Sequence, residues 1–224
     1  MKRSVVQAMI LSDWQRHRTL LLLSIVSGVL ALALIQVGGE IPFILGATLF
    51  FTVMIVFGCM LPPSNIINER KKQTLPFLMS LPISAMQFTT AKIVSTVGLF
   101  LVPWLALVIA AMAFIVGHRG GPQGIIPVVL ILAAAPFVGF CVIAGVSLVS
   151  ESEGAMIAAT IATNTSYGFS WYLLVRNPVI RADMQSREIV WSREVLTVLS
   201  AEFAVIVLIL GLTFFLQSRK RDFL

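Results

Sequence analysis

Long uninterrupted apolar stretches are the feature of this sequence that most restricts its fold. Six of them, each 18 to 25 residues long, cover residues 20–37, 41–61, 93–116, 125–149, 155–175 and 195–216. Because a helix rises about 1.5 Å per residue, each stretch matches a hydrocarbon core of about 30 Å. Transmembrane β-strands would instead be segments of about 10 residues with alternating polarity. The sequence therefore predicts an all-α integral membrane protein with six transmembrane helices.

The composition agrees with this class. Only 12% of the 224 residues are charged, and the mean hydropathy is +0.97. Soluble domains carry about 25% charged residues, so an ordinary soluble domain is excluded. No boundary or soluble insertion is visible, and we expect residues 1–224 to form a single transmembrane domain.

Residues 1–19 precede the first apolar stretch and have a pattern of their own. Val6, Ile10 and Trp14 follow one another at four-residue spacing, which places them on one helix face. Such a pattern predicts an amphipathic helix lying in the cytoplasmic interface. The sequence at 31–33 imitates the cleavage site of a signal peptide, but the preceding region is long for one, so we expect the segment to be retained.

The positive charges predict the orientation, because the side of the membrane with more Lys and Arg is usually cytoplasmic. Eleven of these residues lie in the N-terminal flank, the second-to-third connection and the C-terminal tail, and five lie on the opposite side. We therefore expect a multi-pass protein of the cytoplasmic (inner) membrane with both termini in the cytoplasm. The net charge of +6 is spread over short flanks, so it does not indicate a nucleic-acid surface.

No catalytic or metal-binding pattern is present. His17 and His118 are the only two histidines and both lie outside the apolar stretches, so an intramembrane enzyme would lack a base at the required depth. Motifs of serine hydrolases, zinc proteases and phosphate loops are absent from the sequence. Cys59 and Cys141 are isolated within apolar stretches and are expected to be packing residues. The sequence thus predicts a non-catalytic chain that binds no metal or cofactor of its own.

The connection formed by residues 62–92 combines charge with an apolar segment. Thr74 can cap a short helix that Pro82 ends. This helix presents several apolar side chains directly after the charged residues 69–72. Such a surface must be covered, either by lipid headgroups or by a cytoplasmic partner with a hydrophobic groove.

The motifs of this connection also carry a family resemblance. They are Glu69-Arg70, Thr74-Leu75 with Phe77-Leu78, and Leu81-Pro82-Ile83-Ser84, followed by Lys92 at the start of the next apolar stretch. This order resembles the coupling-helix region of type-2 (ABC-2) ABC exporter permeases, although Gln73 stands where members often have Gly. The six stretches and the N-terminal segment extend the likeness to nearly the whole chain.

The resemblance implies an ATP-driven exporter whose energy comes from another chain. A separate ATPase subunit would bind ATP and Mg²⁺ and receive the short helix in a groove. A second permease, identical or related, would face this one around the transport path. The implied ATPase-coupling residues are Glu69, Arg70, Lys71, Lys72, Thr74, Leu75, Phe77, Leu78 and Leu81. Because the family carries peptides, lipids, glycans, drugs and ions, the resemblance names no substrate.

A secondary transporter or channel without an ATPase partner is the alternative. Polar residues do occur within the apolar stretches, as they would along a substrate or ion pathway. A broken-helix transporter would have matching interrupted helices in its two halves, and the sequence has none.

Small residues recur along the fifth stretch, residues 155–175. The positions at four-residue spacing are Gly154, Ala158, Ala162, Ser166 and Ser170. A face of small residues permits close helix packing, and together with Asn164 it could also line a substrate path. The resemblance places this helix near the interface of the two permeases, where both interpretations are compatible.

Glu202 is the most unusual residue of the last stretch. Without it the remaining apolar segment is too short to cross a membrane, so Glu202 is expected just under the outer interface. A carboxylate there usually has a partner, and the loop at 176–194 supplies Arg176, Arg181, Arg187 and Arg193. We expect an ion pair, for example to Arg176 or Arg193, that holds this loop as an external gate; contact with substrate or a protonatable role is the alternative. Ile180 and Met184, four residues apart, predict that the loop folds back onto the membrane surface.

Overall fold

The computed structural model describes residues 2–67, 85–117, 122–150 and 152–219. Within these ranges all regular elements are helical. They are α1 (Lys2–Gln36), α2 (Glu40–Pro62), the π-helical turn η1 (Pro63–Ile67), α5 (Ala85–Gly117), α6 (Ile125–Ser150), α7 (Glu153–Arg176), α8 (Pro178–Met184) and α9 (Arg193–Arg219).

Five of these helices are long and apolar enough to cross a membrane, namely α1, α2, α5, α6 and α9. α7 is 24 residues long, but its many polar residues keep it out of this set. The expected class, an α-helical multi-pass membrane protein, is therefore confirmed with five apolar helices. The sixth expected span, residues 155–175, coincides with α7 and stays a prediction.

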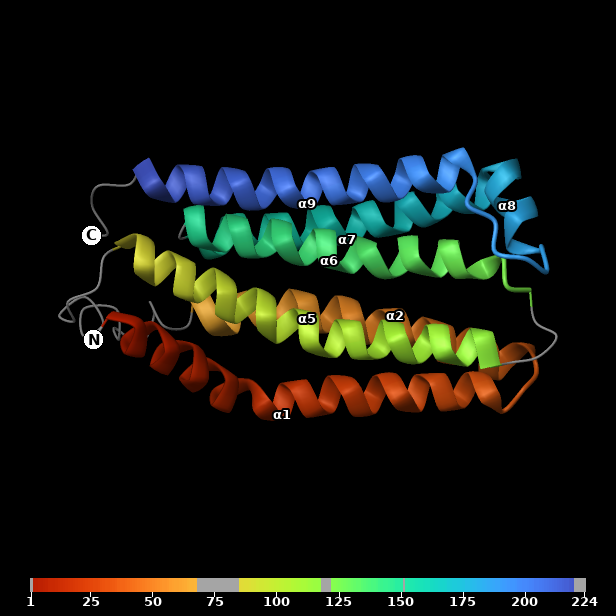
Figure 1. Ribbon diagram of the computed structural model, residues 1–224, viewed down its shortest axis with the longest axis horizontal. Helices are drawn as coiled ribbons and strands as arrows, with labels where there is room; N and C mark the ends of the chain where they lie inside the picture. Colours follow the sequence, from red (N-terminus) through yellow and green to blue (C-terminus); the bar gives the residue numbers. More distant parts are fainter. Residues whose placement is uncertain (1, 68–84, 118–121, 151, 220–224) are drawn as a thin grey trace.

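The long helices form an elongated bundle with α6 at its centre (Figure 1). α6 packs against α2, α5, α7 and α9, while α1 packs against α2 and α5 on one side of the bundle. α1 begins and α9 ends at the same end of the bundle, which we call the terminal end (Figure 1). α8 lies at the opposite end, which we call the α8 end.

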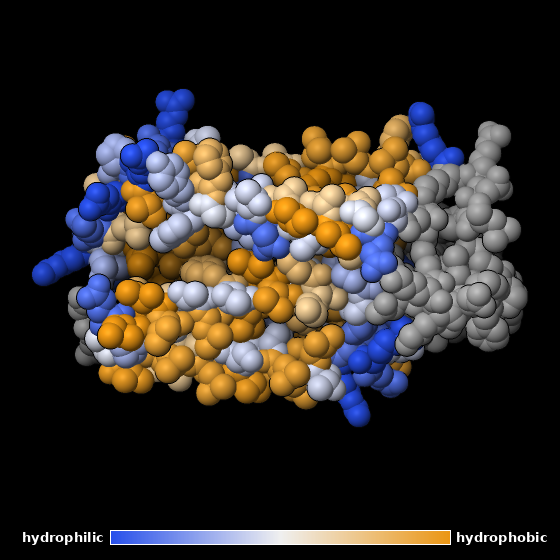
Figure 2. Space-filling model, turned by 180° about the vertical axis from the view of Figure 1, so that it is seen from behind, coloured by the Kyte–Doolittle hydropathy of each residue, from blue (hydrophilic) through white to orange (hydrophobic). Residues whose placement is uncertain are grey.

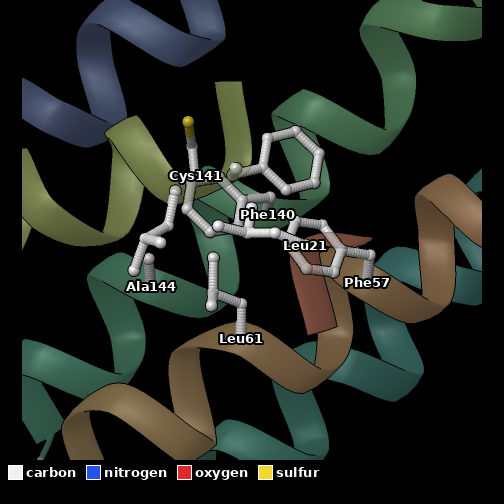
Figure 3. Close-up of a cluster of buried hydrophobic side chains, with 8 residues drawn as sticks. Leu21, Phe57, Leu61, Phe140, Cys141 and Ala144 are labelled. Carbon is white, nitrogen blue, oxygen red and sulfur yellow. The ribbon is translucent and has the colours of Figure 1, made fainter. Parts of the chain in front are cut away.

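Stacked aromatic rings fill the core where α2, α5 and α6 meet. The rings of Phe100 and Phe140 are 4.3 Å apart between centroids and nearly parallel, and Phe57 stacks on Phe100 at 5.9 Å. Leu21 of α1 packs against the same cluster (Figure 3). Cys141 is fully buried there, as expected for a packing residue. Burial of such large apolar side chains, each contributing about 1.5–3 kcal/mol, holds the two sides of the bundle together.

A proline and a glycine of α6 shape its contact with α7. Pro136 lacks an N–H, so it cannot donate the helical hydrogen bond to the carbonyl oxygen four residues before it. The Tyr167 hydroxyl of α7 lies 3.5 Å from the Pro136 carbonyl oxygen. Gly139 makes the approach possible, because a Cβ atom there would overlap the Tyr167 hydroxyl. On the other side of α6, Trp104 donates a hydrogen bond to the Ala133 carbonyl oxygen at 2.7 Å.

The loop at 176–194 folds back onto the bundle. Asn177 caps α8 by accepting a hydrogen bond from the Val179 N–H at 3.0 Å. Ile180 is only 2% exposed and, with Met184, packs into a cluster formed by α6, α7 and α9. The Gly124 N–H also donates to the Ser186 carbonyl oxygen at 3.1 Å. The spacing of Ile180 and Met184 predicted a loop that folds back, and the two side chains do so onto the helix bundle; a position on the membrane surface stays a prediction.

The N-terminal segment differs from the expectation. A separate interfacial helix is not seen, because α1 runs from Lys2 to Gln36 without interruption. Trp14, expected at the interface, packs against the aromatic core cluster instead. The side chain before it, Asp13, is 3% exposed and bonds to α5. This contact draws the N-terminal half of α1 onto the bundle.

Candidate functional site

A cluster of buried polar side chains lies at the terminal end, where α1, η1 and α5 meet. None of its members is more than 4% exposed. They are Asp13 and His17 from α1, Asn65 from η1, and Lys92, Ser95 and Thr96 from α5. We call this group the Asp13 cluster. Buried polar groups in an apolar bundle are costly unless they are paired, so the contacts within the cluster decide what it does.

An ion pair forms the first half of the Asp13 cluster. Lys92 Nζ donates to both carboxylate oxygens of Asp13 at 3.1 Å. The Ser95 hydroxyl donates to Asp13 Oδ2 at 2.7 Å. Such charge-assisted bonds are about twice as strong as neutral ones. The two donors of α5 therefore hold one carboxylate of α1 in a defined position.

An amide and a hydroxyl form the second half. Asn65 Nδ2 donates to Thr96 Oγ1 at 2.7 Å. Asn65 Oδ1 and His17 Nε2 are buried, and neither has a hydrogen-bond partner of good geometry within the described ranges. His17 follows Asp13 by four residues, and Thr96 follows Lys92 by four, so each pair shares one face of its helix. Each helix thus presents buried polar groups over a full turn, while the hydrogen bonds that join α1 to α5 are those of Asp13 with Lys92 and Ser95.

Sequence analysis did not find this cluster. Lys92 was counted only as a positive flank and as part of the family resemblance, and His17 only as an unsuitable base. Asp13 was not singled out at all. A single acidic residue just before an apolar stretch was the available signal, since such a residue needs a cation nearby.

The expected ATPase-coupling residues lie outside the described part of the chain. All of them belong to residues 68–84: Glu69, Arg70, Lys71, Lys72, Thr74, Leu75, Phe77, Leu78 and Leu81. The two flanks of this segment are described, and both contribute to the Asp13 cluster. Asn65 belongs to η1 on one side, and Lys92 belongs to α5 on the other.

The small-residue face of α7 is open. Its expected members Ala158, Ala162, Ser166 and Ser170 are all exposed, as is Asn164. Only two residues of α7 are buried, Met156 and Leu174. The face therefore does not pack against another helix within the described ranges. Packing against a second chain and lining a substrate path both stay predictions.

Figure 2 views the molecule from the side on which α2 and α7 lie in front. Paler and more polar residues interrupt the apolar surface there, and the surface is hollowed toward the α8 end. The helices approach each other where Asn164 Nδ2 lies 3.6 Å from Cys59 Sγ. The amide also donates to the Thr160 carbonyl oxygen of its own helix at 2.8 Å.

The predicted ion pair of Glu202 is wrong. Glu202 Oε2 is buried and has no hydrogen-bond partner among the described residues. The four arginines of the loop are all exposed, and Arg176 lies over the Tyr172 ring at 4.9 Å. Glu202 precedes Ile206 by four residues, so it shares the face of α9 that packs on the core.

Replacing Glu202 with Gln is therefore expected to leave the loop at 176–194 as resistant to limited proteolysis as in the unmodified chain. Removing the charge of a buried oxygen without a partner costs the folded state nothing. Ile180→Asp is the matched contrast, because it places a charge in the buried cluster and should expose the loop. Faster cleavage between residues 176 and 194 in Glu202→Gln would show that an ion pair does form.

Two small cavities lie between the helices of the described ranges. The two best cavities hold about 10 Å³ each, which is barely the space of one water molecule. The same ranges contain no group of three or more His, Cys, Asp or Glu side chains that could hold a metal ion.

These features define an α-helical multi-pass membrane protein with a buried ion-pair cluster at one end and an open, partly polar helix on its side. Comparisons with models of known protein families, with curated proteins and with solved structures find no match for this chain.

Proposed function

We propose that this chain is the permease subunit of an ATP-driven exporter of the ABC-2 type. It would span the cytoplasmic (inner) membrane six times, with α7 as the fifth span and both termini in the cytoplasm. A separate ATPase subunit would bind ATP and Mg²⁺ and dock onto residues 69–84. A second copy of the chain, or a related permease, would complete the transport path. The motif order from Glu69 to Ser84 is the basis of the family assignment.

The open face of α7 is the structural observation that carries the proposal. A helix with exposed Asn164, Ser166 and Ser170 is poorly matched to lipid, and it suits a protein neighbour or a water-filled path. The Ser166 hydroxyl already donates to the Ala162 carbonyl oxygen at 2.8 Å. A second helix can therefore pack on this face without leaving that donor unpaired. Two copies meeting near α7 would place a path between them.

In this arrangement the permease and the ATPase have different roles. The permease contributes walls of the path and a docking segment, whereas the ATPase supplies the free energy. Nucleotide-driven movement of the docked segment would alternately expose the path to the two sides of the membrane. None of these steps requires a catalytic side chain in the permease.

Affinity purification of the tagged chain in mild detergent tests the proposal. Recovery of a nucleotide-binding subunit together with a second permease supports the exporter. An oligomer of this chain alone that conducts ions in planar bilayers supports the alternative, a channel or secondary transporter. The purified complex also reports whether the second permease is identical or related.

The orientation gives a separate prediction. A single Cys introduced at Gln185, which is exposed at the α8 end, should react in sealed cells with a thiol reagent that cannot cross the membrane. The background lacks Cys59 and Cys141. A Cys at Lys71 should react only after the cells are opened. Labelling of the Lys71 site in sealed cells would reverse the orientation.

A further inference from the structure

The Asp13 cluster links the two flanks of residues 68–84 to each other, and it links one of them, α5, to α1. Asn65 lies just before this segment, in η1, and Lys92 lies two turns into α5, just after it. Both are buried, at 0% and 2% exposure. Asn65 reaches α5 through Thr96, and Lys92 reaches α1 through Asp13. The spacing of the two flanks is therefore set inside the bundle.

We propose that Asp13 is a positioning residue, which holds Lys92 and thereby fixes α5, the flank after residues 68–84, against α1. The flank before the segment follows α5 through the bond of Asn65 to Thr96, so movement of the segment is passed to α1. This inference rests on the proposed function for the source of the movement, an ATPase docked on residues 69–84. The contact of Asp13 with Lys92 and Ser95, which we call the clamp, can be tested without the ATPase.

The geometry of the ion pair suits this task. A bidentate contact with a hydroxyl as third donor fixes the register of two helices more sharply than apolar packing does, because a slip of one turn would separate the charges. Apolar side chains can exchange neighbours during such a slip at little cost. Farther toward the α8 end, α1 and α5 meet through apolar contacts such as Gly28 against the Leu107 side chain. The Asp13 cluster is therefore the point that sets their alignment.

α1 can carry the movement to the other end of the bundle. It is one continuous helix from Lys2 to Gln36, so a shift at the terminal end moves the whole element. It also packs closely on α2, because a Cβ atom at Gly46 would lie 2.7 Å from the Ala31 carbonyl oxygen. A displacement of α1 is thus passed to α2, which borders the open face of α7.

The clamp is tested by the distance between spin labels at Leu11 and Val94, two exposed positions on α1 and α5. The labels are placed in the full chain with Cys59 and Cys141 replaced by Ala. Asp13→Asn should broaden the distance distribution. Exchange of the two charges, Asp13→Lys with Lys92→Asp, should narrow it again.

Two further variants keep this test decisive. Ser95→Ala removes only the 2.7 Å hydroxyl bond to Asp13 and should broaden the distribution less, even if Asp13→Asn does not fold. Gln217→Leu removes a buried hydrogen bond of α9 to the Leu148 carbonyl oxygen on α6, and it should leave the distribution unchanged. Folded Asp13→Asn with the unmodified distribution, or a folded charge exchange that stays broad, would overturn the clamp.

The transmission step has its own readout in the complex with the co-purifying ATPase. A non-hydrolysable ATP analogue should change the distance between labels at Val37 and Ile189, two exposed positions. Asp13→Asn should keep the bound ATPase but lose this change, and the charge exchange should restore it. The unmodified change in Asp13→Asn would refute the positioning role. Failure to recover any ATPase would refute the proposed function and leave the label test of the clamp standing.

Discussion

Replacement of Asp13 by Asn is expected to lower the free energy of unfolding, by less than the loss of about 3 to 5 kcal/mol that follows when a buried charge is left with no partner at all, because Lys92 keeps a further interaction. Lys92 is 2% exposed and would lose both of its bonds to the carboxylate. Lys92→Met should have a similar effect, since the Asp13 charge would keep only the bond from Ser95. Denaturant titration of the chain in detergent, followed by helicity and by Trp fluorescence, measures both losses.

The double variant Asp13→Asn with Lys92→Met separates the ion pair from general damage. The double variant removes both members of the ion pair, so part of the free energy of unfolding lost in the single variants should return. Glu40→Gln serves as the control, because Glu40 is exposed and its change should stay within about 0.5 kcal/mol. If the losses of the two single variants simply add in the double variant, the two charges do not stabilise each other.

The apolar stretches predicted helices well where the two coincide. Residues 41–61 and 125–149 correspond to α2 and α6 within one residue at each end. α1 and α5 instead begin far before their apolar stretches, at Lys2 and Ala85. Hydropathy assigns such polar turns to the flanks, because it sums values of single residues and contains no contribution from the ion pair of Asp13 with Lys92. The extra turns of both helices are stabilised by a contact between segments 79 residues apart.

Contacts between distant segments also explain why the candidate site was predicted only in part. A single sequence shows which faces are polar, and it identified the small-residue face of α7 from its spacing. It could not show that this face is open, because exposure depends on how α6 and α7 pack around Gly139 and Tyr167. The ion pair of Glu202 failed for a related reason. The arginines are close to it along the chain, but they are exposed, whereas Glu202 Oε2 is buried and has no hydrogen-bond partner among the described residues.

Replacing Phe77 and Leu78 together with Asp is expected to abolish association with the ATPase while the chain still inserts into the membrane. If both side chains bind in an apolar groove, each contributes about 1.5–3 kcal/mol, so their loss removes roughly 3 to 6 kcal/mol of binding free energy. This corresponds to an affinity decrease of more than about a hundredfold. Two added carboxylates would also be buried without partners, which increases the loss further. Co-purification from membranes and nucleotide hydrolysis by the recovered material measure the effect.

The matched control keeps the apolar character at both positions, with Phe77→Leu and Leu78→Met, and should retain most of the bound ATPase because volume-conserving apolar exchanges cost little. Insertion is checked by the Cys at Gln185, whose labelling from outside should be the same in every variant. Because the substituted residues lie outside the Asp13 cluster, the spin-label distance between Leu11 and Val94 should also stay unchanged. A chain that carries both Asp residues and still retains its ATPase would refute the assignment of residues 69–84 as the docking segment. An intact distance together with lost association would instead separate the two roles, with docking by residues 69–84 and alignment of their flanks by Asp13.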